Sequence, residues 1–438
     1  MSDILIKDAT IVSMDPERNI NVFDGDIFIS NGLINYVKDK NENNNQESPS
    51  KVTDNYREIN GSGYIIMPGL INTHGHAAMS LLRSYADDLP LMKWLEEKIF
   101  PVEARLTAND VYWGTMLSIV EMIRSGTTTF TDMYFFMEEV ARASSESGIR
   151  AVLSRGMVGP DNNEQARRNE IKNLFNDWNG ALGNRVSITL GPHAIYTCPP
   201  EIMKNICEMA HELKSPLQIH VSETKVEVDN CLKEHGGTPV EVLAEIGLFE
   251  HPVICAHCVH LTEKDIDILA KAKAGIAHNP GSNLKLGSGI APLPQMLKAN
   301  IKVGLGTDGP SSNNNLDMFE EMRLAALIHK GVNEDPTLIS ANTALTMATS
   351  MGAEALFIPK LGKIKEGYRA DIIGISKNKA HLIPFHDIEA HLVYSACGAD
   401  VDMVMVDGNM LMEKRELLTL DEERIFHEAG KSASRLIE

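Results

Sequence analysis

Polar residues that bind metals or carry protons stand where five apolar, strand-like segments of this sequence end. In chain order these residues are His74, His76, His193, His220, Glu223, His257 and Asp308. Imidazoles and carboxylates are ligands of borderline divalent metals such as zinc, and both also act as general acids and bases. These positions are therefore the candidates for a metal-assisted reaction.

The pair His74-Gly75-His76 has a spacing of two, which on an extended strand directs both rings to the same side. The preceding stretch Pro68-Gly69-Leu70-Ile71-Asn72 places the pair at a strand end. Such a pair is common, and alone it is weak evidence for a metal. Together with His220 and Asp308 it makes three imidazoles and a carboxylate, a ligand set that leaves room for a water.

Each candidate also has an ordinary structural explanation. His220 and His257 could be core histidines bonded to backbone carbonyls. Asp308 could cap a helix, because Gly309-Pro310-Ser311 follows it. Glu223 could be a solvated residue at the start of a helix. Only the joint placement of these residues at successive strand ends favours chemistry, and that placement depends on the predicted strands.

With a metal present, the candidates suit hydrolytic attack at an sp² carbon. A bound Zn²⁺ lowers the pKa of its water from about 15.7 to about 7. Asp308 would accept the proton of that water, and Glu223, three residues past His220, would transfer a proton to a ring nitrogen. His257 would hydrogen-bond the attacking oxygen and help to hold the tetrahedral intermediate.

Apolar β-rich segments alternate with helical stretches from Tyr64 onward. This alternation is typical of parallel strands with crossover helices, and eight strands are the number that closes a (β/α)8 barrel, whose catalytic residues lie at the C-terminal strand ends. The predicted strands are Tyr64–Ile71, Thr127–Met133, Ala151–Met157, Val186–Pro192, Leu217–Ser222, Val253–His257, Gly275–Asn279 and Ile301–Asp308. The predicted helices include Asp110–Ile123, Pro200–Leu213, Thr238–Ile246, Glu263–Ala272 and Leu316–Ile328.

Both chain ends favour β-structure instead. Short alternating segments predict antiparallel strands at Ile4–Met14, Gly25–Ile29, Gly32–Val37, Gly362–Ile375, His391–Tyr394 and Val401–Asp407. The polar stretch Asp39–Asn55 predicts a mobile insertion, and Asp421–Leu436 predicts a helix. We therefore predict an α/β fold in which a (β/α)8 TIM barrel (67–359) is inserted in a small β-sandwich domain built from both chain ends (1–66 and 360–420). A C-terminal helix (421–438) follows.

Composition excludes several classes of function. Among 438 residues, 41 Lys and Arg face 60 Asp and Glu, a net charge of −19 that repels nucleic acid and anionic lipid. Six cysteines without repeated spacing give no disulfide framework. The first residues lack a signal-peptide pattern, and no apolar stretch reaches the ~20 residues of a membrane helix. We expect a cytoplasmic protein.

Two motifs suggest other chemistry and fail on context. Residues 304–309 satisfy G-x-G-x-x-G, but Pro310 and a polar loop follow instead of the helix that a dinucleotide site requires. Cys255-Ala256-His257-Cys258 lacks the H-x-E and P-C-x-x-C elements of a cytidine-deaminase zinc site. Its two cysteines are better explained as small apolar side chains.

Nearly the whole chain resembles the amidohydrolase superfamily. The general resemblance is carried by 4–12, 67–76 and 362–371. Within the superfamily the chain is most similar to the 5′-methylthioadenosine/S-adenosylhomocysteine deaminases, a group that includes the methanogen-type 5′-deoxyadenosine deaminases. The motifs of this closer match are His74-Gly75-His76-Ala77-Ala78-Met79-Ser80-Leu81-Leu82-Arg83, residues 94–103, His220-Val221-Ser222-Glu223-Thr224, residues 256–261 and Gly306-Thr307-Asp308-Gly309.

The resemblance implies one zinc ion per subunit. Its ligands would be His74, His76, His220 and Asp308. Iron, manganese and nickel are alternatives, because three imidazoles and a carboxylate accept these metals too. The fourth predicted strand does not end in a lysine, so a carboxylated lysine bridging two metals has no candidate.

The resemblance also implies roles at the substrate. Glu103 would bind the ribose hydroxyls, His193 would lie near the nucleoside, and Glu223 and Asp308 would carry protons. Arginines would meet a carboxylate-bearing substrate tail, and Arg155 and Arg167 fall near the expected places.

We therefore expect zinc-dependent hydrolytic deamination at C6 of adenine nucleosides modified at the 5′ position. Candidate substrates are 5′-deoxyadenosine, 5′-methylthioadenosine, S-adenosylhomocysteine and adenosine. We expect no nucleic-acid or membrane partner, and a homo-oligomer, either a tetramer or a dimer. One alternative is another hydrolase on the same frame, such as a guanine deaminase or an aminotriazine or chlorotriazine hydrolase. Another is a non-catalytic scaffold of the dihydropyrimidinase-like type, which should have lost ligands, whereas every ligand position here is filled.

Overall fold

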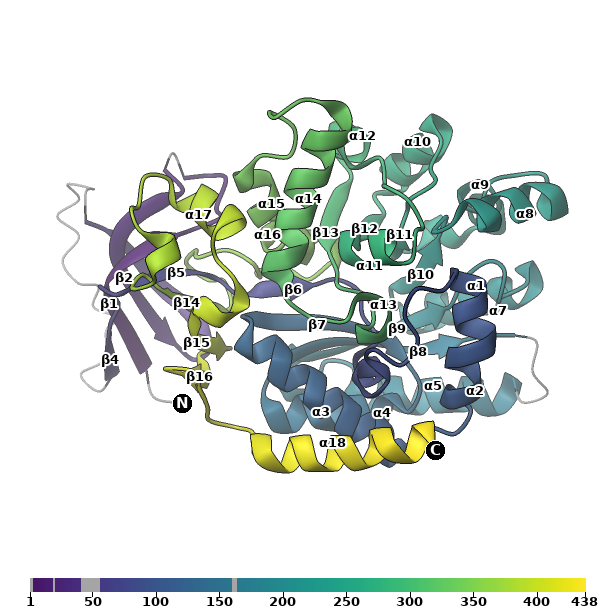
Figure 1. The fold of residues 1–438 in the computed structure, drawn as a ribbon, viewed down its shortest axis with the longest axis horizontal. Coiled ribbons are helices and arrows are strands. Elements are labelled where there is room, and N and C mark those ends of the chain that lie inside the picture. Colours follow the sequence, from purple (N-terminus) through teal and green to yellow (C-terminus); the bar gives the residue numbers. More distant parts are fainter. Residues whose placement is uncertain (1–2, 19, 41–55, 160–163) are drawn as a thin grey trace.

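Two β-sheets organise the chain, which a computed structural model describes over residues 3–18, 20–40, 56–159 and 164–438. An eight-stranded parallel sheet forms a barrel surrounded by helices. A nine-stranded sheet that is mostly antiparallel combines strands from both chain ends. In Figure 1 this terminal sheet lies on the left and the barrel with its helices on the right. The predicted α/β fold, with a TIM-type barrel inserted in a β-structure built from both ends, is confirmed.

The barrel strands follow one another in chain order. Each pairs in parallel with its sequence neighbours, and the backbone N–H of Thr73 donates to the carbonyl of Leu305 at 2.9 Å where the first and last strands meet. The strands are β6 (Leu70–Asn72), β7 (Thr127–Tyr134), β8 (Arg150–Met157), β9 (Val186–Pro192), β10 (Leu217–Val221), β11 (Val253–His257), β12 (Gly275–His278) and β13 (Lys302–Leu305).

Helices between these strands begin at residues that satisfy free backbone N–H groups. Thr107, Thr238 and Thr262 each form a capping box with an acidic residue three positions later. The longer helices are α3 (Ala108–Arg124), α4 (Met137–Ser147), α5 (Glu164–Trp178), α7 (Pro200–Leu213), α8 (Lys225–His235), α9 (Pro239–Ile246), α10 (Glu263–Ala272) and α14 (Met318–Asn333). Shorter ones are α1 (Leu91–Trp94), α2 (Phe100–Glu103), α6 (Ala181–Asn184), α11 (Pro280–Lys285), α12 (Leu293–Lys298), α13 (Pro310–Asn313), α15 (Ala341–Met347) and α16 (Ser350–Ala355).

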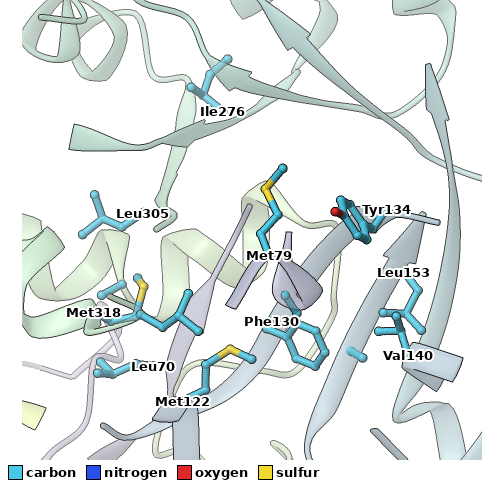
Figure 2. Close-up of a cluster of buried hydrophobic side chains, with 14 of the residues drawn as sticks. Leu70, Met79, Met122, Phe130, Tyr134, Val140, Leu153, Ile276, Leu305 and Met318 are labelled. Carbon is cyan, nitrogen blue, oxygen red and sulfur yellow. The ribbon is translucent and has the colours of Figure 1, made fainter. Parts of the chain in front are cut away.

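The buried core holds these helices against the barrel. Figure 2 shows Phe130 of β7 beside Met122 of α3, with Leu153 of β8 beside Val140 of α4. All four side chains are almost completely buried and belong to one apolar cluster. None of the helices in the described part of the chain has the length and apolar run needed to cross a membrane.

The terminal sheet joins the first and last parts of the chain through β5 and β14. Its order is β17-β16-β15-β14-β5-β1-β2-β3, with β4 beside β1. Its strands are β1 (Asp3–Val12), β2 (Val22–Ser30), β3 (Leu33–Asp39), β4 (Tyr56–Asn60), β5 (Tyr64–Pro68), β14 (Ile372–Ser376), β15 (Val401–Val406), β16 (Asn409–Glu413) and β17 (Glu416–Leu417). The C-terminal helix α18 (Glu422–Ile437) lies along α3 (Figure 1).

A buried arginine connects the two sheets. Arg150, the first residue of β8, donates from Nε to Asp371 at 2.8 Å and from Nη2 to Asp407 at 2.6 Å. Asp371 precedes β14 and Asp407 follows β15, so one guanidinium of the barrel is bonded to two carboxylates of the terminal sheet.

The structure corrects three sequence predictions. The predicted strand Tyr64–Ile71 is two strands in different sheets, which Gly69 separates. A Cβ at Gly69 would lie 2.1 Å from Thr128 Oγ1. The predicted strand His391–Tyr394 is wrong: it lies in helix α17 (Ile388–Tyr394), which the Asp387 side chain caps. Within the predicted strand Gly362–Ile375, only the end from Ile372 is extended in the sheet.

The predicted domain limits stay predictions. The chain passes from the terminal sheet into the barrel between Pro68 and Leu70. Most of the predicted mobile insertion Asp39–Asn55 lies outside the described residues.

Candidate active site

The C-terminal edge of the barrel brings the candidate residues to one place. His220 lies in β10 and His257 is the last residue of β11. The others follow strand ends directly or by a few residues: His74 and His76 after β6, His193 after β9, Glu223 after β10 and Asp308 after β13. This edge is where barrel enzymes carry their active sites.

Left-handed backbone directs several of these side chains. The φ angles are 51° at Ser222, 71° at His257 and 60° at Asp308, a region that costs a non-glycine residue about 1–3 kcal/mol. Hydrogen bonds hold one of these turns in place: the Glu227 carboxylate accepts from the N–H of Ser222 at 3.0 Å and of Glu223 at 2.7 Å. Such strain is typical of functional sites.

Four side-chain atoms converge as metal ligands would. The Oδ1 of Asp308 lies 3.2 Å from His76 Nε2 and 3.4 Å from His74 Nε2. The Nε2 of His220 lies 3.4 Å from that of His76. His74 Nε2 is buried and has no hydrogen-bond partner among the described residues. Buried polar atoms are rarely left unpaired, so these residues fit a divalent cation between them.

Backbone carbonyls orient two of the imidazoles. His76 Nδ1 lies 2.7 Å from the carbonyl oxygen of Met133, and His220 Nδ1 lies 2.8 Å from that of His193. A carbonyl can only accept, so each Nδ1 carries the hydrogen and each Nε2 keeps its lone pair. This is the tautomer that a metal ligand needs, with the second contact that usually supports it.

Two serines orient the carboxylate. Ser282 Oγ donates to Asp308 Oδ2 at 2.7 Å, and Ser312 Oγ donates to the same oxygen at 2.6 Å. The other oxygen, Oδ1, is therefore left to face the imidazoles.

Glu223 lies beside this cluster as a buried acid. Its Oε2 is 3.8 Å from His257 Nε2, and Ser288 Oγ donates to its Oε1 at 3.3 Å. Burial, helped by the charge of Asp308, raises the pKa of Glu223 to about 8. Burial lowers the pKa of His257 to about 4. Near neutral pH the site therefore holds a carboxylic acid that can donate a proton beside a neutral imidazole.

A cavity opens over the cluster. Polar groups gather at the strand ends, whereas the other walls are mainly apolar and aromatic, as in pockets for small organic ligands. Met79 and Tyr134, seen in Figure 2, line it from the core side. The apolar and aromatic walls include Leu91, Trp94, Leu95, Phe100, Met133, Phe135, Val158, Tyr196 and Leu286.

Glu103 and His193 also line this cavity. Glu103 ends α2, and its Oε1 accepts a hydrogen bond from Tyr134 Oη at 2.6 Å. Burial raises the pKa of Glu103. The Nδ1 of His193 lies 2.9 Å from Thr197 Oγ1.

The two predicted arginines do not line the cavity. Arg155 donates from Nε to Glu170 Oε1 at 3.1 Å, and its guanidinium lies 5.2 Å from the ring centre of Phe135. Arg167 donates to the carbonyl of Val158 and lines a separate small pocket beside α5 and α7.

Several residues of the site escaped sequence analysis. They are Ser282 and Ser312 at Asp308, Glu227 under Glu223, Tyr134 at Glu103, and Asn279 and Asn283 at His257. Spacing offers a signal for two of them, because Glu227 and Ser312 each lie four residues after a candidate. Ser282 and Asn283 lie in α11 and Asn279 directly precedes it, and the position of this helix depends on the assembled barrel.

Comparison with protein families gives a match to the amidohydrolase family over residues 65–411. The chain belongs to the amidohydrolase family. A 5-methylthioadenosine/S-adenosylhomocysteine deaminase of Dictyoglomus turgidum is 50% identical over 424 residues, 96% of this chain and 98% of that protein. The expectation of a hydrolase that acts on carbon–nitrogen bonds is confirmed.

Solved structures extend the match to the whole fold. An adenosine deaminase of Xanthomonas campestris with bound zinc has a TM-score of 0.92 and 32% identity, covering 100% of this chain and 99% of its own. An atrazine chlorohydrolase of Arthrobacter aurescens complexed with zinc has a TM-score of 0.89 and 26% identity, covering 99% of this chain and 100% of its own. With the converging ligands His74, His76 and His220, these neighbours support a metal cofactor in this family member.

Proposed function

We propose that the protein deaminates adenine nucleosides modified at the 5′ position, converting C6–NH₂ to C6=O and releasing ammonia. Its substrates would be 5′-deoxyadenosine, 5′-methylthioadenosine, S-adenosylhomocysteine and adenosine. One observation carries the proposal: the buried carboxyl of Glu223 lies beside three converging imidazoles and Asp308 at one cavity. Burial raises the pKa of this carboxyl to about 8. The named relatives support the choice of substrate class.

His74, His76, His220 and Asp308 would hold one divalent ion, which we propose to be zinc. When bound, it would lower the pKa of a water molecule enough to supply hydroxide near neutral pH. The neutral tautomers of His76 and His220, set by backbone carbonyls, suit this role.

Glu223 and Asp308 would move the protons. Glu223, protonated in the resting site, would donate to N1 of the adenine ring, which makes C6 more electrophilic. Asp308 would accept the proton of the attacking water and pass it to the leaving amino group. His257 would donate a hydrogen bond to the oxygen that attacks C6.

Two residues would orient the nucleoside. Glu103, which lines the cavity from the end of α2, would accept hydrogen bonds from the ribose hydroxyls, and Tyr134 would hold its carboxylate. His193 would contact the nucleoside near the strand ends. The apolar walls would take the 5′ substituent and exclude water from the ring.

A substrate panel with a metal assay tests the proposal. Purified protein is analysed for bound metal and then given the four adenine nucleosides, guanine and a chlorotriazine, with ammonia and chloride release measured. Deamination of a 5′-modified adenine nucleoside by metal-loaded protein supports the proposal. Turnover of guanine or the triazine alone would assign a different hydrolase activity to the same frame.

Glu223→Gln separates proton transfer from metal binding. The variant keeps the shape of the side chain and all four proposed ligands but cannot supply the proton. We expect a fall in kcat of about 10²–10⁴-fold with metal content unchanged. Near-normal kcat in a metal-loaded Glu223→Gln protein would overturn the role of Glu223.

The homo-oligomer, either dimer or tetramer, and the cytoplasmic location stay predictions. The same holds for contact of Arg155 and Arg167 with a substrate carboxylate.

A further inference from the structure

Two asparagines contact the inner edge of the His257 ring. The Nδ1 of His257 lies 2.9 Å from Asn283 Nδ2 and 3.3 Å from Asn279 Nδ2. Both asparagines are almost completely buried, and they belong to α11 and the residue before it. Their spacing of four places them on one side of that helix, so both amides reach the same ring nitrogen.

This contact is opposite in kind to those of the proposed metal ligands. The Nδ1 atoms of His76 and His220 face backbone carbonyl oxygens, which only accept. The Nδ1 of His257 faces amide nitrogens, which only donate. A neutral imidazole has one N–H and one lone pair, so a donor at Nδ1 moves the hydrogen to Nε2.

We propose that Asn279 and Asn283 are positioning residues that hold His257 as the Nε2–H tautomer. His257 then presents a hydrogen-bond donor to the cavity and stays outside the set of metal ligands. Geometry alone allows two groups of metal ligands, His74 with His76 and His220, or His74 with His257 and Asp308. The proposed tautomer excludes the group that contains His257.

The other end of the ring supports the same tautomer. His257 Nε2 faces the Glu223 carboxyl, whose Oε2 is 3.8 Å away, and Asp308 contributes a further carboxylate nearby. A hydrogen directed at the Asp308 carboxylate is attractive, whereas a lone pair in that place is repelled by its negative charge. The amide nitrogens of Asn279 and Asn283 face Nδ1, and their side-chain oxygens have no hydrogen-bond partner among the described residues.

Nitrogen NMR of the zinc-loaded protein reads the tautomer directly. Protein labelled with ¹⁵N-histidine is deuterated, and long-range ¹H–¹⁵N correlations identify the protonated nitrogen of each ring. The His257 signals are assigned by their loss in His257→Phe. We expect a protonated Nε2 and a bare Nδ1 at His257, with the reverse at His76 and His220. A protonated Nδ1 at His257 would overturn the proposal, and this arm requires no turnover.

Asn283→Asp inverts the contact without changing its shape. A carboxylate at this position accepts from Nδ1–H, so the NMR pattern of His257 should reverse. With the hydrogen moved away from the cavity, we expect kcat to fall on the order of 100-fold while KM changes by less than about threefold. Asn283→Ala, which removes the donor without adding an acceptor, should lose less. An unchanged tautomer in a folded Asn283→Asp protein would contradict the proposal.

Asn333→Asp is the matched control. Asn333 lies in α14 and donates to the carbonyl of His329, away from the cavity. The same amide-to-acid change there should leave kcat within about twofold. The kinetic arm rests on the proposed deaminase activity. If wild-type protein deaminates no adenine nucleoside, that activity fails, and the NMR arm still decides the tautomer.

Discussion

Hydroxyl groups behind Asp308 determine which of its oxygens faces the imidazoles. Ser282 and Ser312 both donate to Oδ2, and they come from different helices, α11 and α13. The carboxylate is thereby fixed from two directions before any ligand arrives. Removing a hydrogen-bond partner of a metal ligand usually lowers metal affinity or activity about 10–100-fold.

Replacing both serines tests this support. We expect Ser282→Ala/Ser312→Ala to weaken metal binding about 10–100-fold, because Asp308 can then rotate and present either oxygen. Competition with a chelator of known affinity measures the change. Ser311→Ala is the control, since Ser311 lies next to Ser312 but donates to the sulfur of Met79. Equal metal affinity in the double variant and the control would show that the serines do not orient Asp308.

The sequence predicted the residues at the strand ends better than the residues that hold them in place. His220, His257 and Asp308 could be found because each lies at or near the end of an apolar strand, and the ends of parallel barrel strands meet at one edge. Ser282 and Asn283 could not be found, because nothing in the local sequence tells that α11 packs behind that edge. Contacts made through a short helix between strands depend on the assembled barrel.

Between β8 and α5, one ion pair bears on the choice of substrate. Glu170 of α5 binds Arg155, which lies over the Phe135 ring at the cavity wall. A substrate carboxylate near the 5′ end would compete with Glu170 for this guanidinium and would be repelled by Glu170 itself. If the 5′ end of the substrate reached Arg155, the pair would favour uncharged 5′ substituents.

Glu170→Gln should shift this preference. We expect kcat/KM for S-adenosylhomocysteine, relative to 5′-methylthioadenosine, to rise about fivefold, the effect of a half-exposed ion pair. Glu212→Gln removes an equal charge from the Lys172 pair nearby and should leave the ratio unchanged. Equal ratios of kcat/KM in wild type and Glu170→Gln would show that Arg155 does not influence the choice between these two substrates.

Helix α14 carries a buried carboxyl that connects three elements. Glu321 Oε2 accepts from the N–H of Gly281 at 3.0 Å, and its Oε1 accepts from Asn313 Nδ2 at 2.8 Å. Burial raises the pKa of Glu321 from 4.5 to about 8. The folded protein therefore holds this proton more tightly than the unfolded chain does.

Because the pKa of Glu321 is higher in the folded protein, the stability of the fold decreases as pH rises. The stability contributed by protonated Glu321 is present below about pH 4.5 and is lost as pH rises through about 8. We expect the midpoint of thermal unfolding to fall between about pH 5 and 8 more steeply in wild type than in Glu321→Gln, which does not titrate. Differential scanning fluorimetry of both proteins across this range measures the slopes. Parallel slopes would mean that Glu321 does not titrate there.

Elements were predictable where local signals agree. The bounds of α7 and α10 match the predicted Pro200–Leu213 and Glu263–Ala272, since a proline or a capping threonine marks each start. The strand predicted at His391–Tyr394 failed because its apolar residues also suit one helical face, and the cap at Asp387 lies outside the segment. The division of Tyr64–Ile71 between two sheets needs the close approach of Gly69 to Thr128, which is a tertiary contact.

For the whole molecule, the buried arginine between the sheets is a polar connection from the barrel to the terminal sheet. The Arg150 side chain is 2% exposed and pairs with Asp371 and Asp407. Removing the cation leaves the buried Asp371 without a counter-charge, a change that usually costs about 3–5 kcal/mol. Asp407 keeps its ion pair with Arg369.

Arg150→Met should therefore lower the free energy of unfolding by about 3–5 kcal/mol in urea titrations. Lys225→Met is the control, because Lys225 pairs with Asp229 on the surface, where ion pairs contribute less than about 1 kcal/mol. Equal losses in the two variants would show that the pairing does not hold the sheets together.

The pairing of β5 with β14 also bears on how the chain is made. The ribosome completes β5 long before β14, because the entire barrel lies between them in the sequence. Until β14 is made, the edge of β5 that pairs with it stays unpaired. At roughly 5–20 residues per second, that delay is on the order of 15–60 s. During that time the unpaired apolar edge can pair with other nascent chains on the same polysome. We therefore expect chaperones that bind exposed strand edges to associate with the nascent chain.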